Sequence, residues 1–318
     1  MTAAQQTGGT DYGDEFPVVF RCEGTELVGI INRPRGAEVG VVLVAGGDQY
    51  RVGSHRLFVQ LARNLAEAGV AVLRFDHRGI GDNRGNYDGF ENTFPDIEAA
   101  VETLVNNVPA LRSLALCGLC DGASAALMAG HQISKVDTLL LINPWVHSSN
   151  LEARARIEGY YISRLRGKEF WKKLVTGKIN IPKSLLSLGG YLMHFLKSAL
   201  TPETTMIRAP GYVYRMLVGL RRFDGSVLVA LSGNDLVAQE FRELVKMQRR
   251  WSDVMGRDNV NVIDFPAADH SFTSASERCA LERTLAAALR DGRSTGATPP
   301  VSGLSRANRA ETSPGSHS

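Results

Sequence analysis

The sequence is poor in cysteine and has no long apolar run. Its 318 residues include only four cysteines, too few for the disulfide framework of a small secreted domain. Residues 1–15 are polar and lack the basic and apolar stretches of a secretory signal. The most apolar window, 181–200, is interrupted by Lys183, His194 and Lys197, whereas a spanning helix needs about 20 nearly uninterrupted apolar residues. We therefore expect no membrane span and a reducing, cytoplasmic setting.

Charge is unevenly distributed along the chain. The net charge is only +3, but residues 151–222 contain 14 Lys and Arg against 4 Asp and Glu. The remainder is therefore acidic, and the basic segment marks a compositional boundary. A hydrophobic fraction of 44% is typical of a globular protein with a full-sized core.

Apolar, β-branched segments alternate with segments of helical periodicity. A hairpin is expected at 16–32. Strands are expected at 39–45, 70–75, 113–119, 136–142, 226–231 and 260–265, and helices at 55–68, 91–108, 121–131, 237–254 and 273–289. This alternation predicts an α/β fold with a mostly parallel central sheet and helices on both faces.

The alternation is interrupted once, which divides the chain into parts. We expect a flexible leader at 1–14, a core formed by 15–145 and 223–290, and a disordered tail at 291–318. The basic segment at 146–222 has helical stretches but no convincing strand. We interpret it as a helical cap over the C-terminal ends of the strands, where ligands of open α/β sheets bind.

The segment Gly118-Leu-Cys120-Asp-Gly122 follows an apolar strand and begins a helix of small residues. A Gly-x-nucleophile-x-Gly sequence at a strand-to-helix turn is the nucleophile elbow of α/β hydrolases, here with Cys in place of the usual Ser. Glycines are needed because other side chains there would collide with the neighbouring strand and helix. Two simpler interpretations are a small residue in a tight turn and a redox pair with Cys117. The redox pair is disfavoured because Cys117 lies inside the strand.

Two further residues complete a catalytic set in the order nucleophile, acid, histidine that α/β hydrolases use. Asp235 lies in the turn after the strand at 226–231, and His270 lies in the loop after the strand at 260–265. None of the other six histidines occupies a comparable position. The sequence therefore predicts a Cys120–His270–Asp235 triad, in which His270 takes the thiol proton and Asp235 orients the imidazole.

An oxyanion hole needs two N–H donors. We expect one to be the backbone amide of Asp121, directly after the nucleophile, and the other to come from Asp48 or Gln49 in the loop after the strand at 39–45. The carboxylates of Asp48 and Asp121 would bring negative charge to this site unless they point away. The two remaining cysteines, Cys22 and Cys279, are interpreted as ordinary core residues.

The glycine-rich turn at 76–83 lacks the partners of a phosphate or dinucleotide site. We interpret it as structural, with Asp76 and Arg78 holding loops in place. The sequence contains no metal-ligand cluster, so we expect neither a cofactor nor a metal, and no nucleic-acid partner.

Three segments, Gly47–Arg56, Leu73–Asp82 and Gly118–Ser124, together resemble the type-1 exosortase A system-associated hydrolases. These are α/β hydrolases of bacterial exopolysaccharide gene clusters, and the resemblance covers about residues 16–290. It implies a cytoplasmic hydrolase with a Cys-His-Asp triad, linked by genetic context to exopolysaccharide production, and it implies no particular substrate. More distantly, the chain is similar to dienelactone hydrolases, which also have Cys in the elbow, and to capped esterases of the serine aminopeptidase group.

Acyl hydrolysis of an ester or thioester, through an acyl-enzyme on Cys120, is the leading hypothesis. The basic cap would favour an anionic small-molecule or carrier-bound acyl substrate, although its charges could equally solvate an outer face. Acyl transfer to a saccharide or carrier would use the same residues, and a non-catalytic binding protein is the third alternative. The apolar part of the cap is also a candidate for peripheral membrane contact.

Overall fold

The computed structural model describes residues 14–47, 49–147 and 211–291. The expected leader up to residue 13, Asp48, residues 148–210 of the expected cap and the tail from 292 lie outside the described residues. Among the residues described, we find no helix with the length and apolar character needed to cross a bilayer.

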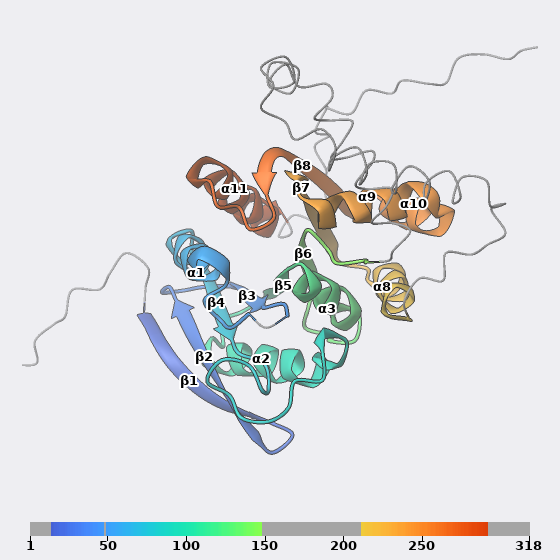
Figure 1. Ribbon diagram of the computed structural model, residues 1–318. Helices are drawn as coiled ribbons and strands as arrows, with labels where there is room; N and C mark the ends of the chain where they lie inside the picture. The colour runs from blue at the N-terminus through green and yellow to red at the C-terminus, as the bar shows by residue number, and fades with distance from the viewer. Residues whose placement is uncertain (1–13, 48, 148–210, 292–318) are drawn as a thin grey trace, which may run out of the picture.

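Eight strands form a single sheet in the order β1-β2-β4-β3-β5-β6-β7-β8 (Figure 1). The first two form the expected hairpin and pair antiparallel, β2 also pairs antiparallel with β4, and all later neighbours pair parallel. The strands are β1 (Asp14–Cys22), β2 (Thr25–Arg33), β3 (Val39–Val44), β4 (Val70–Phe75), β5 (Ser113–Leu119), β6 (Thr138–Ile142), β7 (Ser226–Asn234) and β8 (Val260–Asp269). The expected α/β architecture with a mostly parallel sheet is confirmed.

Helices cover both faces of this sheet. One apolar core packs α1 and α11 against it, and the other packs α2, α3, α8, α9 and α10; Figure 1 shows the two groups on opposite sides. The helices are α1 (Leu57–Glu67), α2 (Phe94–Asn107), α3 (Asp121–Gly130), α8 (Gly211–Arg222), α9 (Leu236–Met247), α10 (Arg249–Met255) and α11 (Ala275–Asp291), with 3-10 turns η1 (Ser54–Arg56) and η2 (Phe90–Asn92).

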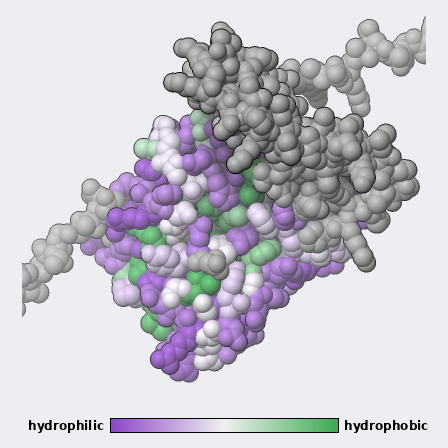
Figure 2. All heavy atoms as spheres, in the orientation of Figure 1, coloured by the Kyte–Doolittle hydropathy of each residue, from purple (hydrophilic) through white to green (hydrophobic). Residues whose placement is uncertain are grey.

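The central strands are buried, as their sequences predict. Every residue of β3, β4 and β6 is buried, as expected for apolar, β-branched runs with helices on both faces. On the face that Figure 2 shows, the described residues carry small apolar patches separated by hydrophilic ones, which is ordinary for the outside of a globular protein.

The structure differs from the sequence-based expectation at the end of the assigned cap. Residues 211–222 form α8, whose apolar side chains lie in the main core. Gly219 lets the helix approach α3, since a Cβ there would come 2.3 Å from the Leu127 carbonyl. The core therefore resumes by Gly211 rather than at residue 223.

Two smaller expectations were wrong. The single helix expected at 237–254 is two helices, because Gln248 has an extended conformation (φ −113°, ψ 107°) that ends α9 and precedes α10. Cys279, expected in the core, is exposed on α11. The periodicity of the two helices continues across the break, and for this reason the sequence pattern did not reveal it.

Candidate active site

Cys120 lies between β5 and α3 in a left-handed backbone conformation (φ 61°, ψ −127°). Such a conformation is costly for a non-glycine residue and is kept only where the surroundings enforce it. The enforcing contacts are tight: a Cβ on Gly118 would lie 2.4 Å from Gly122, and one on Gly122 would lie 2.4 Å from the Val44 carbonyl of β3. The two glycines therefore allow the close strand–helix approach that the elbow sequence predicted.

Asp235 lies directly after β7 and caps α9. Its carboxylate accepts hydrogen bonds from the amides of Val237 and Ala238, both at 3.2 Å, and the residue is 8% exposed. Asp is among the favoured N-cap residues because it satisfies amides that have no partner in the helix. The cap fixes the carboxylate at the edge of the sheet where β7 ends.

His270 follows β8 and joins the other two residues. Its Nδ1 lies 2.9 Å from Asp235 Oδ2, and its ring also makes a side-chain hydrogen bond with Cys120. Burial by itself would lower the pKa of His270, but the hydrogen bonds to Asp235 and Cys120 and the negative charges of both raise it to about 10. The three side chains expected from the sequence are therefore brought together, with an imidazole that holds its proton at neutral pH.

A buried polar network, which the sequence did not reveal, holds the His270 loop. The Asn143 side chain donates to the His270 carbonyl (3.0 Å) and to Ser232 Oγ (2.9 Å), and its Oδ1 accepts from the Ser232 amide (2.8 Å). Ser232 Oγ in turn donates to the Asp269 carbonyl (2.9 Å). Asn143 and Ser232 are fully buried. A polar residue directly after the strand β6 was the only sequence signal for this network.

The loop after β3 packs against the start of α3. The Asp121 carboxylate accepts hydrogen bonds from the amides of Gly122, at 3.1 Å, and of Gly47 across the gap between the two elements. Burial raises the pKa of the Asp121 carboxyl, opposed by hydrogen bonds from the amides of Gly47, of Asp121 itself and of Gly122. This carboxylate therefore points into the loop.

The amide of Gln49 donates to the Gly46 carbonyl at 3.0 Å. Gln49 is thus engaged in a turn, whereas the other expected donor, Asp48, lies outside the described residues. The backbone amide of Asp121 has the expected place at the first residue of α3.

The turn after β4 holds loops together, as expected. The Asp76 carboxylate, fully buried, pairs with the Arg51 guanidinium and accepts the Arg51 amide at 2.6 Å. Asp96 of α2 accepts Arg78 Nε at 2.6 Å. His77 is buried, with Nε2 placed 3.2 Å from the Ala45 carbonyl, so it braces the end of β3.

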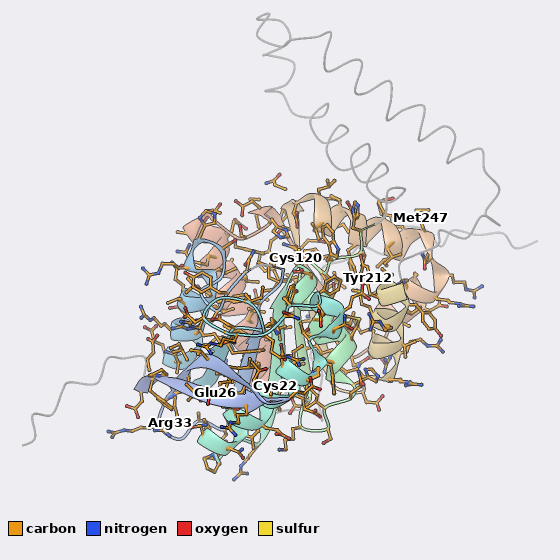
Figure 3. The ribbon with its side chains drawn as sticks, turned by 60° about the horizontal axis from the view of Figure 1, so that its bottom comes forward. Cys22, Glu26, Arg33, Cys120, Tyr212 and Met247 are labelled. Atoms are coloured by element: carbon orange, nitrogen blue, oxygen red, sulfur yellow. The ribbon has the colours of Figure 1, made fainter. Side chains whose placement is uncertain are left out.

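The four cysteines have different environments. Figure 3 shows Cys22 well away from Cys120. Burial, and then the hydrogen bond to Asp96, raise the pKa of Cys22 to about 12, and burial raises that of Cys117 to about 12. These two thiols are therefore poor nucleophiles at neutral pH, while Cys279 is exposed.

Tyr212 of α8 lies on the same side of the molecule as Cys120 (Figure 3). Its hydroxyl donates to the His147 carbonyl at 3.5 Å. Burial raises the pKa of Tyr212, and the negative charges of Glu240, Glu91 and Cys120 raise it further. The hydroxyl therefore stays protonated. Of the two glutamates, Glu91 pairs with Arg215, and Glu240 lies 3.2 Å from His147 Nδ1.

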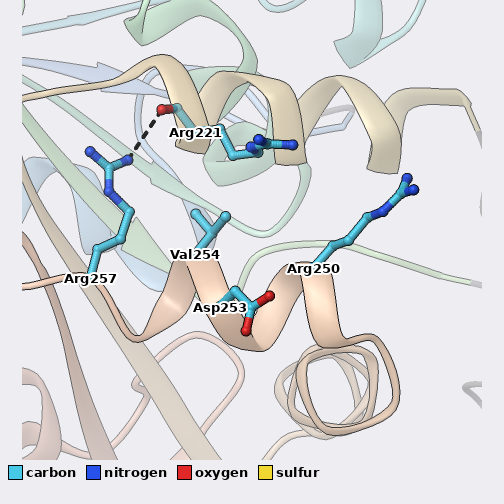
Figure 4. Close-up of a pocket in the computed structure, with 5 residues that line it drawn as sticks. All are labelled: Arg221, Arg250, Asp253, Val254 and Arg257. Carbon is cyan, nitrogen blue, oxygen red and sulfur yellow. Dashed lines mark hydrogen bonds between the residues drawn. The ribbon is translucent and has the colours of Figure 1, made fainter.

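A separate hollow of about 370 Å³ lies between α8 and α10 (Figure 4). It is lined by Arg221, Arg250, Asp253, Val254 and Arg257. Arg257 donates to the carbonyls of Leu220 and Arg221 at 2.8 and 3.3 Å, as basic residues do at helix C-termini. Arg257 therefore caps α8, which leads into the opposite end of the sheet from Cys120.

The fold is that of the α/β hydrolases. The chain is similar to the serine aminopeptidase family S33, whose model matches residues 39–182. A comparison with curated proteins found no match.

Solved structures show the same fold at low sequence identity. An esterase of Pyrococcus furiosus is 17% identical, with a TM-score of 0.59 over 88% of this chain and 93% of its own. A dienelactone hydrolase of Anabaena variabilis is 14% identical, with a TM-score of 0.56 over 88% and 98%. Est1E of Butyrivibrio proteoclasticus, solved with ferulic acid, is 15% identical, with a TM-score of 0.54 over 86% and 99%.

Proposed function

We propose that the protein is an acyl hydrolase that cleaves esters or thioesters through an acyl-enzyme on Cys120. The observation that carries the proposal is the continuous contact from Asp235 through His270 to a cysteine at a strained elbow. The raised pKa of His270 supports an imidazolium partner for the Cys120 sulfur, and the start of α3 adds the favourable end of a helix dipole.

The reaction follows from these groups. The Cys120 sulfur attacks the acyl carbon, and the carbonyl electrons move to the oxygen, which the Asp121 amide and a second donor stabilise. Collapse of this intermediate expels the alkoxide or thiolate leaving group, which takes a proton from His270 and leaves a thioester on Cys120. His270 then removes a proton from water, the hydroxide attacks the thioester, and collapse releases the acid and the Cys120 thiolate. The released thiolate regains its imidazolium partner.

The substrate class follows from the nucleophile. A thiolate leaving group departs more readily than an alkoxide or an amide nitrogen, so we propose thioesters and activated esters ahead of amides. We propose that the 11 Lys and Arg of 151–210 favour an anionic acyl carrier. The link with exopolysaccharide systems stays a proposal from the resemblance alone. Asp48 stays our candidate for the second oxyanion donor.

The experiment compares wild type with Cys120→Ala and His270→Gln on chromogenic esters, a neutral acyl-thioester and an acyl-CoA. We expect turnover that both substitutions abolish, and a KM for acyl-CoA that rises with salt while that of the neutral thioester does not. Equal activity of Cys120→Ala would refute the mechanism. Turnover only when a saccharide or carrier acceptor is added would favour acyl transfer, and tight binding without turnover would favour a binding protein.

A further inference from the structure

The carboxylate of Asp121, the first residue of α3, contacts two elements of the fold. It joins two elements that both border the proposed oxyanion site: the amide of Gly122, in α3, donates to it at 3.1 Å, and the amide of Gly47, in the loop after β3, donates to it as well. Carboxylate oxygens that accept backbone amides make strong, charge-assisted hydrogen bonds. The contact therefore ties the loop to the helix.

The loop is shaped to receive this group. A Cβ on Gly46 would lie 1.9 Å from Asp121 Oδ1, and one on Gly47 would lie 3.3 Å from Oδ2. Both carboxylate oxygens thus occupy space that a side chain in the loop would fill. Gly47 has a left-handed conformation (φ 52°), which glycine adopts without strain. In this conformation its amide donates to the Asp121 carboxylate.

We propose that the Asp121 carboxylate is a positioning group, which holds the loop after β3 at a fixed distance from the nucleophile so that the two sides of the oxyanion site keep their geometry. This inference rests on the proposed acyl-hydrolase function. Its chemistry is separate from that of the triad: the carboxylate acts on the loop, and neither donates nor accepts a proton in the reaction.

Two other roles for Asp121 make different predictions. A carboxylate in the first turn of a helix stabilises the helix dipole, which would affect stability alone. The carboxylate also accepts its own backbone amide, so it could instead occupy the oxyanion site as a resident anion, and its removal would then raise activity. Because Gly47 and Gly122 belong to different elements, the contacts favour the positioning role.

The test separates alkylation of Cys120 from acyl turnover. Alkylation by iodoacetamide needs the reactive sulfur and no oxyanion site, whereas acyl transfer needs both. In a Cys279→Ser background, which removes the exposed competing thiol, Asp121→Ala should lower kcat about 10- to 100-fold. Its KM and the alkylation rate of Cys120 should stay within about threefold of wild type. Asp121→Asn, which keeps one acceptor oxygen, should recover part of the loss.

Glu277→Ala is the matched control, since Glu277 is the first-turn acidic residue of α11. Urea unfolding of each variant shows whether it folds. If Asp121→Ala has a kcat within twofold of wild type, or above it, the positioning role is refuted. A wild-type protein whose turnover survives Cys120→Ala would instead refute the proposed function, a result that does not depend on any variant of Asp121.

Discussion

The pairing of Asp235 with His270 makes a quantitative prediction for Asp235→Asn. The two groups are joined by one hydrogen bond of 2.9 Å, and the Asp235 side chain is 6% exposed while that of His270 is 35% exposed. Unit charges about 4 Å apart interact by roughly 4 kcal/mol at an effective dielectric constant near 20, which corresponds to about 3 pKa units. Solvent at the exposed part of the imidazole weakens this interaction, so we expect the pKa of His270 to fall by about 2 units from its value of about 10.

Asparagine suits this experiment because it leaves the helix cap in place. Asn is as good an N-cap as Asp, so α9 should remain folded and the free energy of unfolding should change by less than about 1 kcal/mol. The amide group, unlike the carboxylate, does not hold the imidazole in its productive tautomer. We therefore expect kcat to fall by about 10³- to 10⁴-fold, together with the change in pKa.

The pKa is measured by NMR titration of the His270 imidazole, assigned by its absence in His270→Gln, and kcat is measured on the same preparations. Asp269→Asn is the matched control. Asp269 is adjacent to His270, but its carboxylate accepts hydrogen bonds from Thr273 instead of the imidazole, so its loss should shift the pKa of His270 by less than about 0.5 units. A titration of Asp235→Asn that matches wild type would show that the charge of Asp235 does not set the proton affinity of His270.

Three further predictions concern stability. Gly122→Ala should cost more than about 3 kcal/mol in urea unfolding, since its Cβ would lie 2.4 Å from the Val44 carbonyl; a loss below 1 kcal/mol would contradict this packing. Asn143→Ala should cost about 2–3 kcal/mol by leaving the buried Ser232 amide without its acceptor, and should lower kcat; unchanged kcat would show that the network does not position the histidine. The pKa of His270 is about 10 in the folded chain and 6.5 as its ordinary value. The stabilisation that its protonation gives to the fold is therefore complete below pH 6.5 and is lost as the pH rises through 10. Because the side chain is 35% exposed, solvent screens this effect. Between pH 6 and 10.5, the free energy of unfolding of wild type should therefore fall by about 1–2 kcal/mol more than that of His270→Gln. Unfolding free energies that change with pH in parallel for the two proteins would contradict this.

The sequence predicted the sheet well because buried parallel strands have a distinctive composition. The run at 39–45 is continuous and β-branched, and β3 occupies Val39–Val44. It did not predict α8, because the basic composition extends through residue 222 and the whole segment was assigned to the cap. Tyr212, Met216 and Leu220 of α8 are nevertheless buried. Composition averages over a segment, whereas burial is decided by one face of a helix.

The residues of the site could likewise be predicted from the sequence only in part. Cys120, Asp235 and His270 could be identified because each follows a strand, and parallel strands end at a common edge. The network of Asn143 and Ser232 could not be identified, since it depends on β6 and β7 being neighbours in register, where Ile142 pairs with Ala230. Side-chain contacts between strands require that register, and the order of residues along the chain does not supply it.

The charges around the site set limits on its substrate. Cys120 and Asp235 each lie at the start of a helix, where the helix dipole favours negative charge, and the imidazolium of His270 lies between them. The carboxylate of Asp235 lies 2.9 Å from its Nδ1. Farther out, Glu91 pairs with Arg215, and Glu240 lies 3.2 Å from His147 Nδ1. The charges that the described residues place around Cys120 are therefore largely paired with one another. If the substrate is anionic, we expect the Lys and Arg of 151–210 to attract it, and the reaction at Cys120 itself should proceed equally well with a neutral thioester.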